Sequence, residues 1–131
     1  MALPPAVVIH GLDHARAALA PGRPVLLLSA AGAGAYAGAM WWRALIAAAL
    51  GSRCEPDALD CAEQAGRALD ALAAGCGIVV LHPCPSFAAV HERAGGALIL
   101  PARPRALDLG QHRANRRLDA WLQGDSGAAF G

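Results

Sequence analysis

The sequence contains no lysine, few aromatic residues and no CxxC pair. All 11 basic residues are arginine, which we attribute to a GC-rich genome. They are balanced by 10 acidic residues, so no strong field attracts nucleic acid or an anionic membrane surface. The hydrophobic fraction of 56% is inflated by 33 alanines. A length of 131 residues suits one domain, because two smaller cores would each be marginal.

A signal peptide and a cysteine framework are also missing. The N-terminal stretch "MALPPAVVIHG" has no basic region ahead of its apolar part. The four cysteines, at positions 54, 61, 76 and 84, match neither a zinc module nor an obvious disulfide framework. We therefore expect a protein of the reducing cytoplasm.

Charge is absent from the 18 residues between Val25 and Trp42, in which Gly34 and Gly38 form a GxxxG pattern. A long uncharged segment with a GxxxG pattern is also typical of a transmembrane helix. However, glycine and alanine supply most of the segment, and Arg43 follows at once. A strand, a glycine turn and a helix account for the same residues, so we do not expect a membrane protein.

Short, continuously apolar runs recur along the chain, which is the pattern of strands buried on both faces. These runs are 6–10, 25–29, 77–82 and 97–100. Helices are expected at 13–20, 34–50, 60–75, 85–93 and 111–123. The alternation predicts a single α/β domain over residues 1–123, with a parallel sheet between two helix layers. The tail 124–131 is expected to fray.

The third strand depends on one segment, "CEPDALD" at 54–60. It contains Pro56, acidic residues and no β-branched residue, which is typical of an edge strand. The third strand is an edge in the Rossmann-like order 3-2-1-4-5 and central in the flavodoxin-like order 2-1-3-4-5. We therefore predict a five-stranded parallel sheet in the Rossmann-like order, with the flavodoxin-like order as the alternative.

Ligands of open α/β sheets bind beyond the carboxyl ends of the strands, where the strand order reverses. In the predicted order, strands one and four flank that crevice, so His10 and His82 would project from adjacent strand ends. The residues that we predict to bind a small anionic ligand are His10, Gly11, Ser29, Gly32, Gly34 and Arg103.

The stretch "LHPCPSF" holds the candidate catalytic residues, Cys84 and His82. If Pro85 is the first helical residue, Cys84 is the helix N-cap, where the helix dipole stabilises a thiolate. A neighbouring imidazole would make that thiol an activated nucleophile. The alternative is a proline-rich turn with a small, partly buried thiol.

The stretch "GAGAYA", residues 32–37, matches the G-x-G-x-x-G/A fingerprint of dinucleotide sites, and Asp60 lies near the distance of a ribose-binding acid. That fingerprint normally follows the first strand, however, and Asp60 with Glu63 also forms a capping-box pattern. Two further interpretations stay open. An anion could bind at the helix start, or the glycines could let the helix pack close to the sheet.

Metal and nucleic-acid binding are both disfavoured. His10, His14, His82 and Cys84 are of metal-ligand type, but scattered histidines more often cap turns or face water. The arginines of the last helix are interrupted by an acid and lie opposite a Leu/Trp stripe, as in a solvated face. We predict neither a metal site nor a nucleic-acid partner.

In "MWWRALI", Trp42 falls in the middle of an apolar helical stripe and Trp41 at its margin. We expect Trp42 to be buried, and Trp41 to stay partly exposed or to form a homodimer contact. Two functions are compatible with the sequence. The first is binding of a small anionic ligand at the strand ends, with weak enzymatic activity and an unassigned cofactor. The second is a non-catalytic module for self-association or partner docking through the apolar helices.

Overall fold

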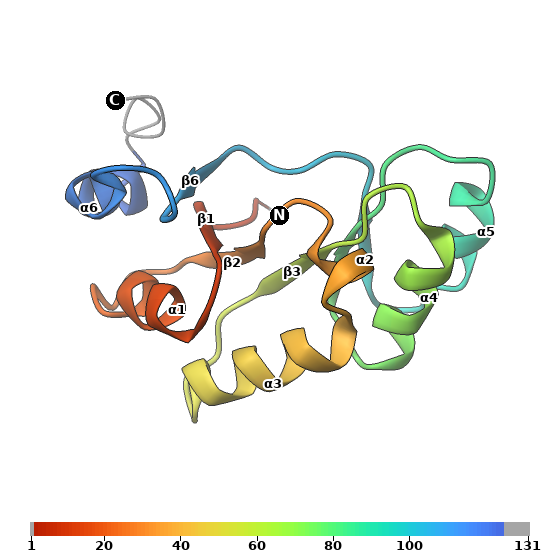
Figure 1. Cartoon of the computed structure of the whole chain (residues 1–131), viewed down its shortest axis with the longest axis horizontal. Coiled ribbons are helices and arrows are strands. Elements are labelled where there is room, and N and C mark those ends of the chain that lie inside the picture. The colour runs from red at the N-terminus through yellow and green to blue at the C-terminus, as the bar shows by residue number, and fades with distance from the viewer. Residues whose placement is uncertain (1, 125–131) are drawn as a thin grey trace.

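The structure is a computed structural model, and residues 2–124 are described. The described residues form one all-parallel sheet of six strands in the order β5-β4-β3-β2-β1-β6 (Figure 1). The strands are β1 (Ala6–Ile9), β2 (Leu26–Ser29), β3 (Asp57–Asp60), β4 (Ile78–Val80), β5 (Leu98–Leu100) and β6 (Ala106–Asp108). The α/β class and the parallel sheet are confirmed. The expected fraying of the tail falls, from residue 125 on, outside the described residues.

The first helix has its predicted length, whereas the later helices are shorter than the sequence predicts. They are α1 (Leu12–Leu19), α2 (Ala33–Tyr36), α3 (Ala39–Leu50), α4 (Ala65–Ala73), α5 (Phe87–Glu92), the 3-10 helix η1 (Ala114–Arg117) and α6 (Leu118–Leu122). The helix expected over 34–50 is interrupted at Gly38, whose φ of 91° lies in the left-handed region. The helix expected over 111–123 begins only at Ala114, as a 3-10 turn.

The predicted strand order is wrong, because β3 is central. It pairs with β2 on one side and with β4 on the other. Both acids within β3 have partners: Trp42 Nε1 donates to Asp57 at 2.8 Å, and Arg103 donates to Asp60 at 2.7 Å. Paired in this way, the carboxylates are tolerated in the middle of the sheet. Neither the Rossmann-like order nor the flavodoxin-like alternative is present.

The sixth strand, β6, was not predicted at all. It pairs with the free side of β1, with Ala6 opposite Ala106 and Val8 opposite Asp108. Leu107, its middle residue, is fully buried. A three-residue strand after the polar segment "PARPR" shows no apolar run that could be recognised in the sequence.

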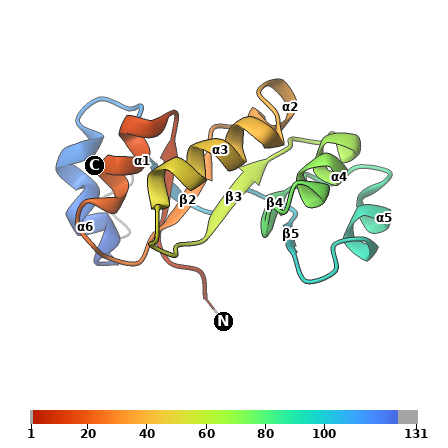
Figure 2. The same cartoon turned by 90° about the horizontal axis from the view of Figure 1, so that it is seen from below.

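The buried helical residues gather on one face of the sheet, so the predicted second helix layer is a further error. They share a hydrophobic cluster with alternate strand residues such as Val7 and Leu27, whereas the cluster on the other face consists of strand residues alone. Figure 2 shows α1, α3 and α4 in front of the strands. Successive strands from β1 to β5 advance in one direction, and right-handed crossovers then place every connecting helix on the same side.

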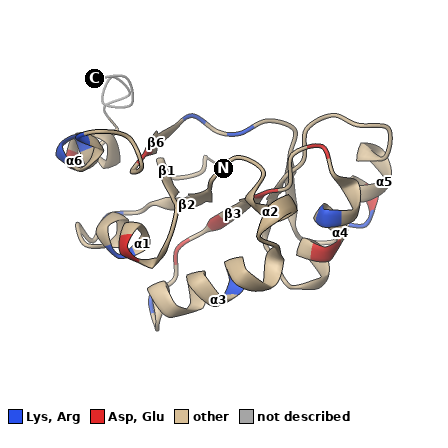
Figure 3. Cartoon of the chain, in the orientation of Figure 1, with Lys and Arg blue, Asp and Glu red and all other residues tan. Residues whose placement is uncertain are grey.

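The opposite face is crossed by the connection from β5 to β6, residues 101–105. This segment leads from one edge of the sheet to the other (Figure 1). Figure 3 shows basic residues on this connection and acidic residues on β3. At the far edge, Trp121 of α6 donates its Nε1 proton to the carbonyl oxygen of Ala6 at 2.7 Å. The C-terminal part of the chain is thereby fixed to β1.

The two neighbouring tryptophans behave as predicted. Trp42 is 0% exposed and lies in the core, whereas Trp41 is 37% exposed. Their ring centroids are 5.9 Å apart. The apolar stripe of α3 therefore faces the sheet as expected. Within residues 2–124, no helix has both the length and the apolar character needed to cross a membrane.

Candidate functional site

The strand order reverses at β1. From β1 the chain proceeds strand by strand to β5 at one edge, whereas β6 returns to the other side of β1. The crevice of a parallel sheet lies beyond the strand ends at such a reversal, here at the ends of β1 and β6. The expected proximity of His10 and His82 is wrong, because β2 and β3 separate β1 from β4.

His10 and Asp108 form a hydrogen-bonded pair at this reversal. His10 directly follows β1 and Asp108 ends β6, and His10 Nε2 lies 2.7 Å from Asp108 Oδ1. An ionised carboxylate only accepts, so Nε2 carries a proton and Nδ1 of the neutral ring keeps its lone pair. Nδ1 has no hydrogen-bond partner within the described part of the chain. The pair thus orients an imidazole that has one free acceptor nitrogen.

The turn after β6 fits closely around this pair. The backbone N–H of Gly110 donates to the same Asp108 oxygen at 2.8 Å. A Cβ atom on Gly110 would lie 2.8 Å from His10 Nε2, which is closer than real Cβ contacts come. Glycine at this position therefore lets the turn approach the imidazole.

His14 of α1 lies beside His10. The backbone N–H of His10 donates to His14 Nδ1 at 3.1 Å, and the two rings meet edge to face with centroids 5.4 Å apart. Neutral His14 therefore carries its proton on Nε2, which has no partner among residues 2–124. A shallow hollow of about 330 Å³ is lined by residues 10–14. It offers one acceptor, His10 Nδ1, and one donor, His14 Nε2.

The start of α1 adds backbone donors to this hollow. Its N-cap, Gly11, makes no side-chain cap, and the first helical hydrogen bond runs from Ala15 N–H to the Gly11 carbonyl at 3.1 Å. The preceding amides have no partner within the helix, and with the helix dipole they favour a negative charge. Asp13 lies in the same first turn and opposes a second negative charge.

Two predicted ligand residues, Ser29 and Arg103, are brought together by Asp60. The Arg103 guanidinium donates to Asp60 Oδ2 at 2.7 Å and to the Ser29 carbonyl oxygen at 3.0 Å. The Asp60 backbone N–H donates to Ser29 Oγ at 2.9 Å. Ser29 and Asp60 are fully buried. The charge of Arg103 is therefore neutralised within the protein, and ligand binding by this residue or by Ser29 stays a prediction.

Asp60 does not cap a helix. The N-cap of α4 is Gln64, so the capping box expected for Asp60 and Glu63 is wrong. Asp60 Oδ1 instead accepts the backbone N–H of Ala62 at 2.7 Å. Ala62 has a φ of 54°, a left-handed conformation that residues other than glycine rarely adopt. The carboxylate thus stabilises a strained turn after β3.

Two of the three glycines expected to bind a ligand, Gly32 and Gly34, have structural roles. Gly32 is the N-cap of α2 with a φ of 72°. A Cβ atom on Gly34 would lie 2.7 Å from Cys61 Sγ and 3.0 Å from the carbonyl oxygen of Asp60. The absence of a side chain at Gly34 therefore lets α2 pack close to the end of β3. Of the three interpretations of the glycine stretch, this contact favours close packing.

Cys84 is not a helix N-cap. That position belongs to Ser86, and α5 begins at Phe87, because the residues from Cys84 onward first form a turn in which Phe87 N–H donates to the Cys84 carbonyl at 3.0 Å. The Cys84 thiol is partly buried against the core. The dipole argument for an activated thiol no longer applies, and the reactivity of Cys84 beside His82 stays a prediction.

Two other thiols are buried in the core. Burial raises the pKa of Cys61 to about 12, with the nearby Cys76 and Asp60 adding to the effect. Burial likewise raises the pKa of Cys76 to about 11. At neutral pH both groups are protonated thiols, which are poor nucleophiles.

Asp108 is the site residue that the sequence reasoning missed, because β6 was missed. A signal does exist: "ALDL" at 106–109 resembles "DALD" at 57–60, which was recognised as a strand. Among residues 2–124, no three His, Cys, Asp or Glu side chains are grouped so that they could hold a metal ion. No protein-family model, curated protein or solved structure matches this chain.

Proposed function

We propose that this protein binds a small, singly charged anion in the hollow lined by residues 10–14, beyond the carboxyl end of β1. The observation that carries the proposal is the His10–Asp108 pair, whose atoms are 2.7 Å apart at the reversal of strand order. His14 and the first amides of α1 supply donors for the ligand, whereas Asp13 disfavours a second negative charge.

The same pair gives the site a capacity for acid–base chemistry. While His10 is neutral, Asp108 fixes the proton on Nε2, so Nδ1 accepts a proton or hydrogen bond from a ligand hydroxyl or amino group. Once the ring is protonated, Nδ1 donates instead and the imidazolium attracts an anion. Weak enzymatic activity would use His10 as the proton-transfer group.

Amide NMR spectra recorded during titration with acetate test the proposal. We expect concentration-dependent shifts at residues 10–14 and at Gly110. Sulfate should bind no tighter than acetate, because Asp13 opposes its second charge. His10→Ala and Asp108→Asn should each weaken acetate binding.

A matched control is His91→Ala, which removes an exposed histidine of α5 at the other end of the sheet. This variant should bind acetate as the wild type does. Shifts centred on Ser29, Arg103 and Cys84, with residues 10–14 unmoved, would refute the proposed site and favour the original strand-end candidates. We also propose a cytoplasmic location, in keeping with four cysteines that are all free thiols.

A further inference from the structure

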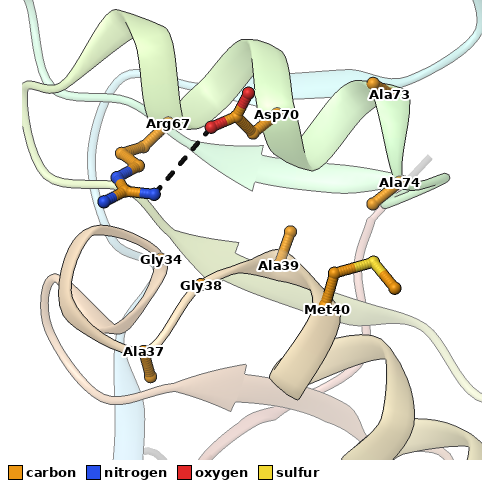
Figure 4. A pocket seen from close by; sticks show the side chains of 9 residues that line it. All are labelled: Gly34, Ala37, Gly38, Ala39, Met40, Arg67, Asp70, Ala73 and Ala74. Carbon is orange, nitrogen blue, oxygen red and sulfur yellow. Dashed lines mark ion pairs between the residues drawn. The ribbon is translucent and has the colours of Figure 1, made fainter.

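A groove of about 430 Å³ lies between α4 and the start of α3 (Figure 4). Its walls are made largely of small residues, among them Gly38 and Ala39 on one side and Ala73 and Ala74 on the other. Such side chains leave a depression of apolar character. Met40 stands on the α3 side, and the charged pair Arg67 and Asp70 projects from α4 (Figure 4).

Exposed hydrophobic residues include and flank, in the sequence, the groove-lining residues 37–40. Met40 is 78% exposed and Tyr36 is 71% exposed, and the partly exposed Trp41 follows directly. These three are among only five large hydrophobic residues that are exposed within residues 2–124, and they lie within six positions of the sequence. A cluster of this kind on a small domain marks an interaction surface.

We propose that a second copy of this chain covers the groove, in a two-fold symmetric dimer. A two-fold contact requires one surface that is complementary to itself. Here the same surface carries a protruding side chain, Met40, and a depression lined by alanine and glycine. Each copy inserts Met40 into the groove of the other. The flexible thioether suits such an apolar depression.

The charges of the groove are self-complementary too. Arg67 and Asp70 lie three residues apart on one face of α4, and their nearest charged atoms are 3.9 Å apart, which is a loose ion pair between exposed side chains. A two-fold axis beside α4 places Arg67 of each copy against Asp70 of the other. An acidic or a basic partner would satisfy only one of the two residues, whereas a second copy satisfies both.

The patch is small, so the dimer is weak. Large hydrophobic contacts come from three side chains, and stable interfaces usually use 20 to 30 residues from each partner. We expect a dissociation constant of roughly micromolar size or weaker. The dimer should therefore be seen as an equilibrium between monomer and dimer that depends on protein concentration.

Sedimentation equilibrium of the full chain across a concentration series tests the proposal. The wild type should dimerise, and Met40→Glu should weaken the dimer at least about tenfold. Arg67→Asp and Asp70→Arg should each weaken it, because each brings like charges together across the axis. The double variant R67D/D70R should recover most of the affinity, because the complementary pairs are restored in reverse.

Leu98→Glu is the matched control, because it charges another exposed hydrophobic residue, on the edge strand β5. It should leave the dissociation constant unchanged, and thermal unfolding should show that every variant is folded. A wild type that stays monomeric at all concentrations would overturn the proposal. Dissociation by Leu98→Glu with Met40→Glu unaffected would overturn it as well, and would place the contact at the sheet edge.

Discussion

The guanidinium of Arg103 lies 2.7 Å from the carboxylate of Asp60, and this ion pair joins the crossing segment 101–105 to the central strand of the sheet. Asp60 is 0% exposed, whereas the Arg103 side chain keeps some contact with solvent. The second guanidinium nitrogen binds the Ser29 carbonyl on β2. One side chain thus holds the segment against two neighbouring strands, on the face that has no buried helical residues.

Arg103→Ala should cost about 3–5 kcal/mol of folding free energy, because it leaves a buried carboxylate without its counter-charge. In the double variant R103A/D60A the loss should be smaller than the sum of the two single losses, since no charge is left unpaired. Urea unfolding of the four proteins measures this coupling. Arg93→Ala, at an exposed arginine after α5, is the control and should change stability by less than about 0.5 kcal/mol. A loss in the double variant equal to the sum of the two single losses would show that Arg103 and Asp60 do not interact.

Asp57 provides a test of stability against pH. Burial raises the pKa of its carboxyl above the ordinary value, although the Trp42 hydrogen bond and the nearby Arg43 act in the opposite direction. Because the pKa is higher in the folded state, ionisation of Asp57 opposes folding; this penalty grows as pH rises from the unfolded-state pKa to the folded-state pKa and is constant above it. Asp57→Asn removes this penalty and keeps an oxygen for Trp42 Nε1, so the stability of the variant relative to wild type should increase as pH rises above the ordinary carboxyl pKa of 3.8.

Asp57→Ala should behave differently from Asp57→Asn. It leaves the buried Trp42 Nε1 without its acceptor, now 2.8 Å away, and should cost about 1–3 kcal/mol. Chemical denaturation of both variants at several pH values distinguishes the two effects. Equal stability of the two variants would show that the tryptophan hydrogen bond contributes nothing.

The thiols should separate into two classes under iodoacetamide. Cys61 and Cys76 should stay unlabelled at about pH 8, because their pKa values of about 12 and about 11 leave almost no thiolate. Cys54 is exposed and should react as an ordinary thiol. If the HPCP turn activates Cys84, that residue will be labelled faster than Cys54. If Cys84 is labelled more slowly than Cys54, Cys84 is a partly buried turn residue without activation. Mass spectrometry with and without urea gives the four rates.

Gly34→Ala should destabilise the protein through crowding, since the new methyl group would lie 2.7 Å from Cys61 Sγ. Combining it with Cys61→Ala should recover part of the loss, because the sulfur is then absent and the Asp60 carbonyl contact remains. Gly32→Ala has open space around it but a φ of 72°, so it should cost only about 1 kcal/mol. Thermal melts rank the variants. If the double variant recovers no thermal stability, contact with the Cys61 sulfur is not the cause of the destabilisation by Gly34→Ala.

The sequence predicts the first five strands because each is a compact apolar or semi-apolar run, and it predicts the burial of Trp42 because helical periodicity is a local property. The order of the strands is not local. Pro56 and the acids of β3 suggest an edge, yet Pro56 precedes the first paired residue and its carbonyl still accepts Leu27 N–H at 3.0 Å. Partners 15 and 43 residues away, Trp42 and Arg103, make the acids acceptable in the centre.

The candidate site was predicted only in part for the same reason. His10 and Gly11 line the hollow beyond β1, not the predicted crevice between strands one and four, and ligand binding by them stays a prediction. Asp108 was missed because a three-residue strand gives no periodic signal, and the likeness of "ALDL" to the third strand was its one local indication. The Cys84 argument failed at a helix boundary, which shifted from Pro85 to Phe87. Helix boundaries depend on which backbone groups form hydrogen bonds in the preceding turn, and a sequence pattern does not predict these bonds.

Because β6 follows the other five strands in the sequence, it can pair with β1 only after they have been synthesised. The strands from β1 to β5 add to one another in the order in which a ribosome would release them, so their pairing needs only nearby segments. The edge of β1 that faces away from β2 must wait until Ala106 is available to pair with Ala6. During that interval an unpaired strand edge is open to other nascent chains. His10 acquires its Asp108 partner only after β6 has paired with β1, so the proposed site cannot form before that step.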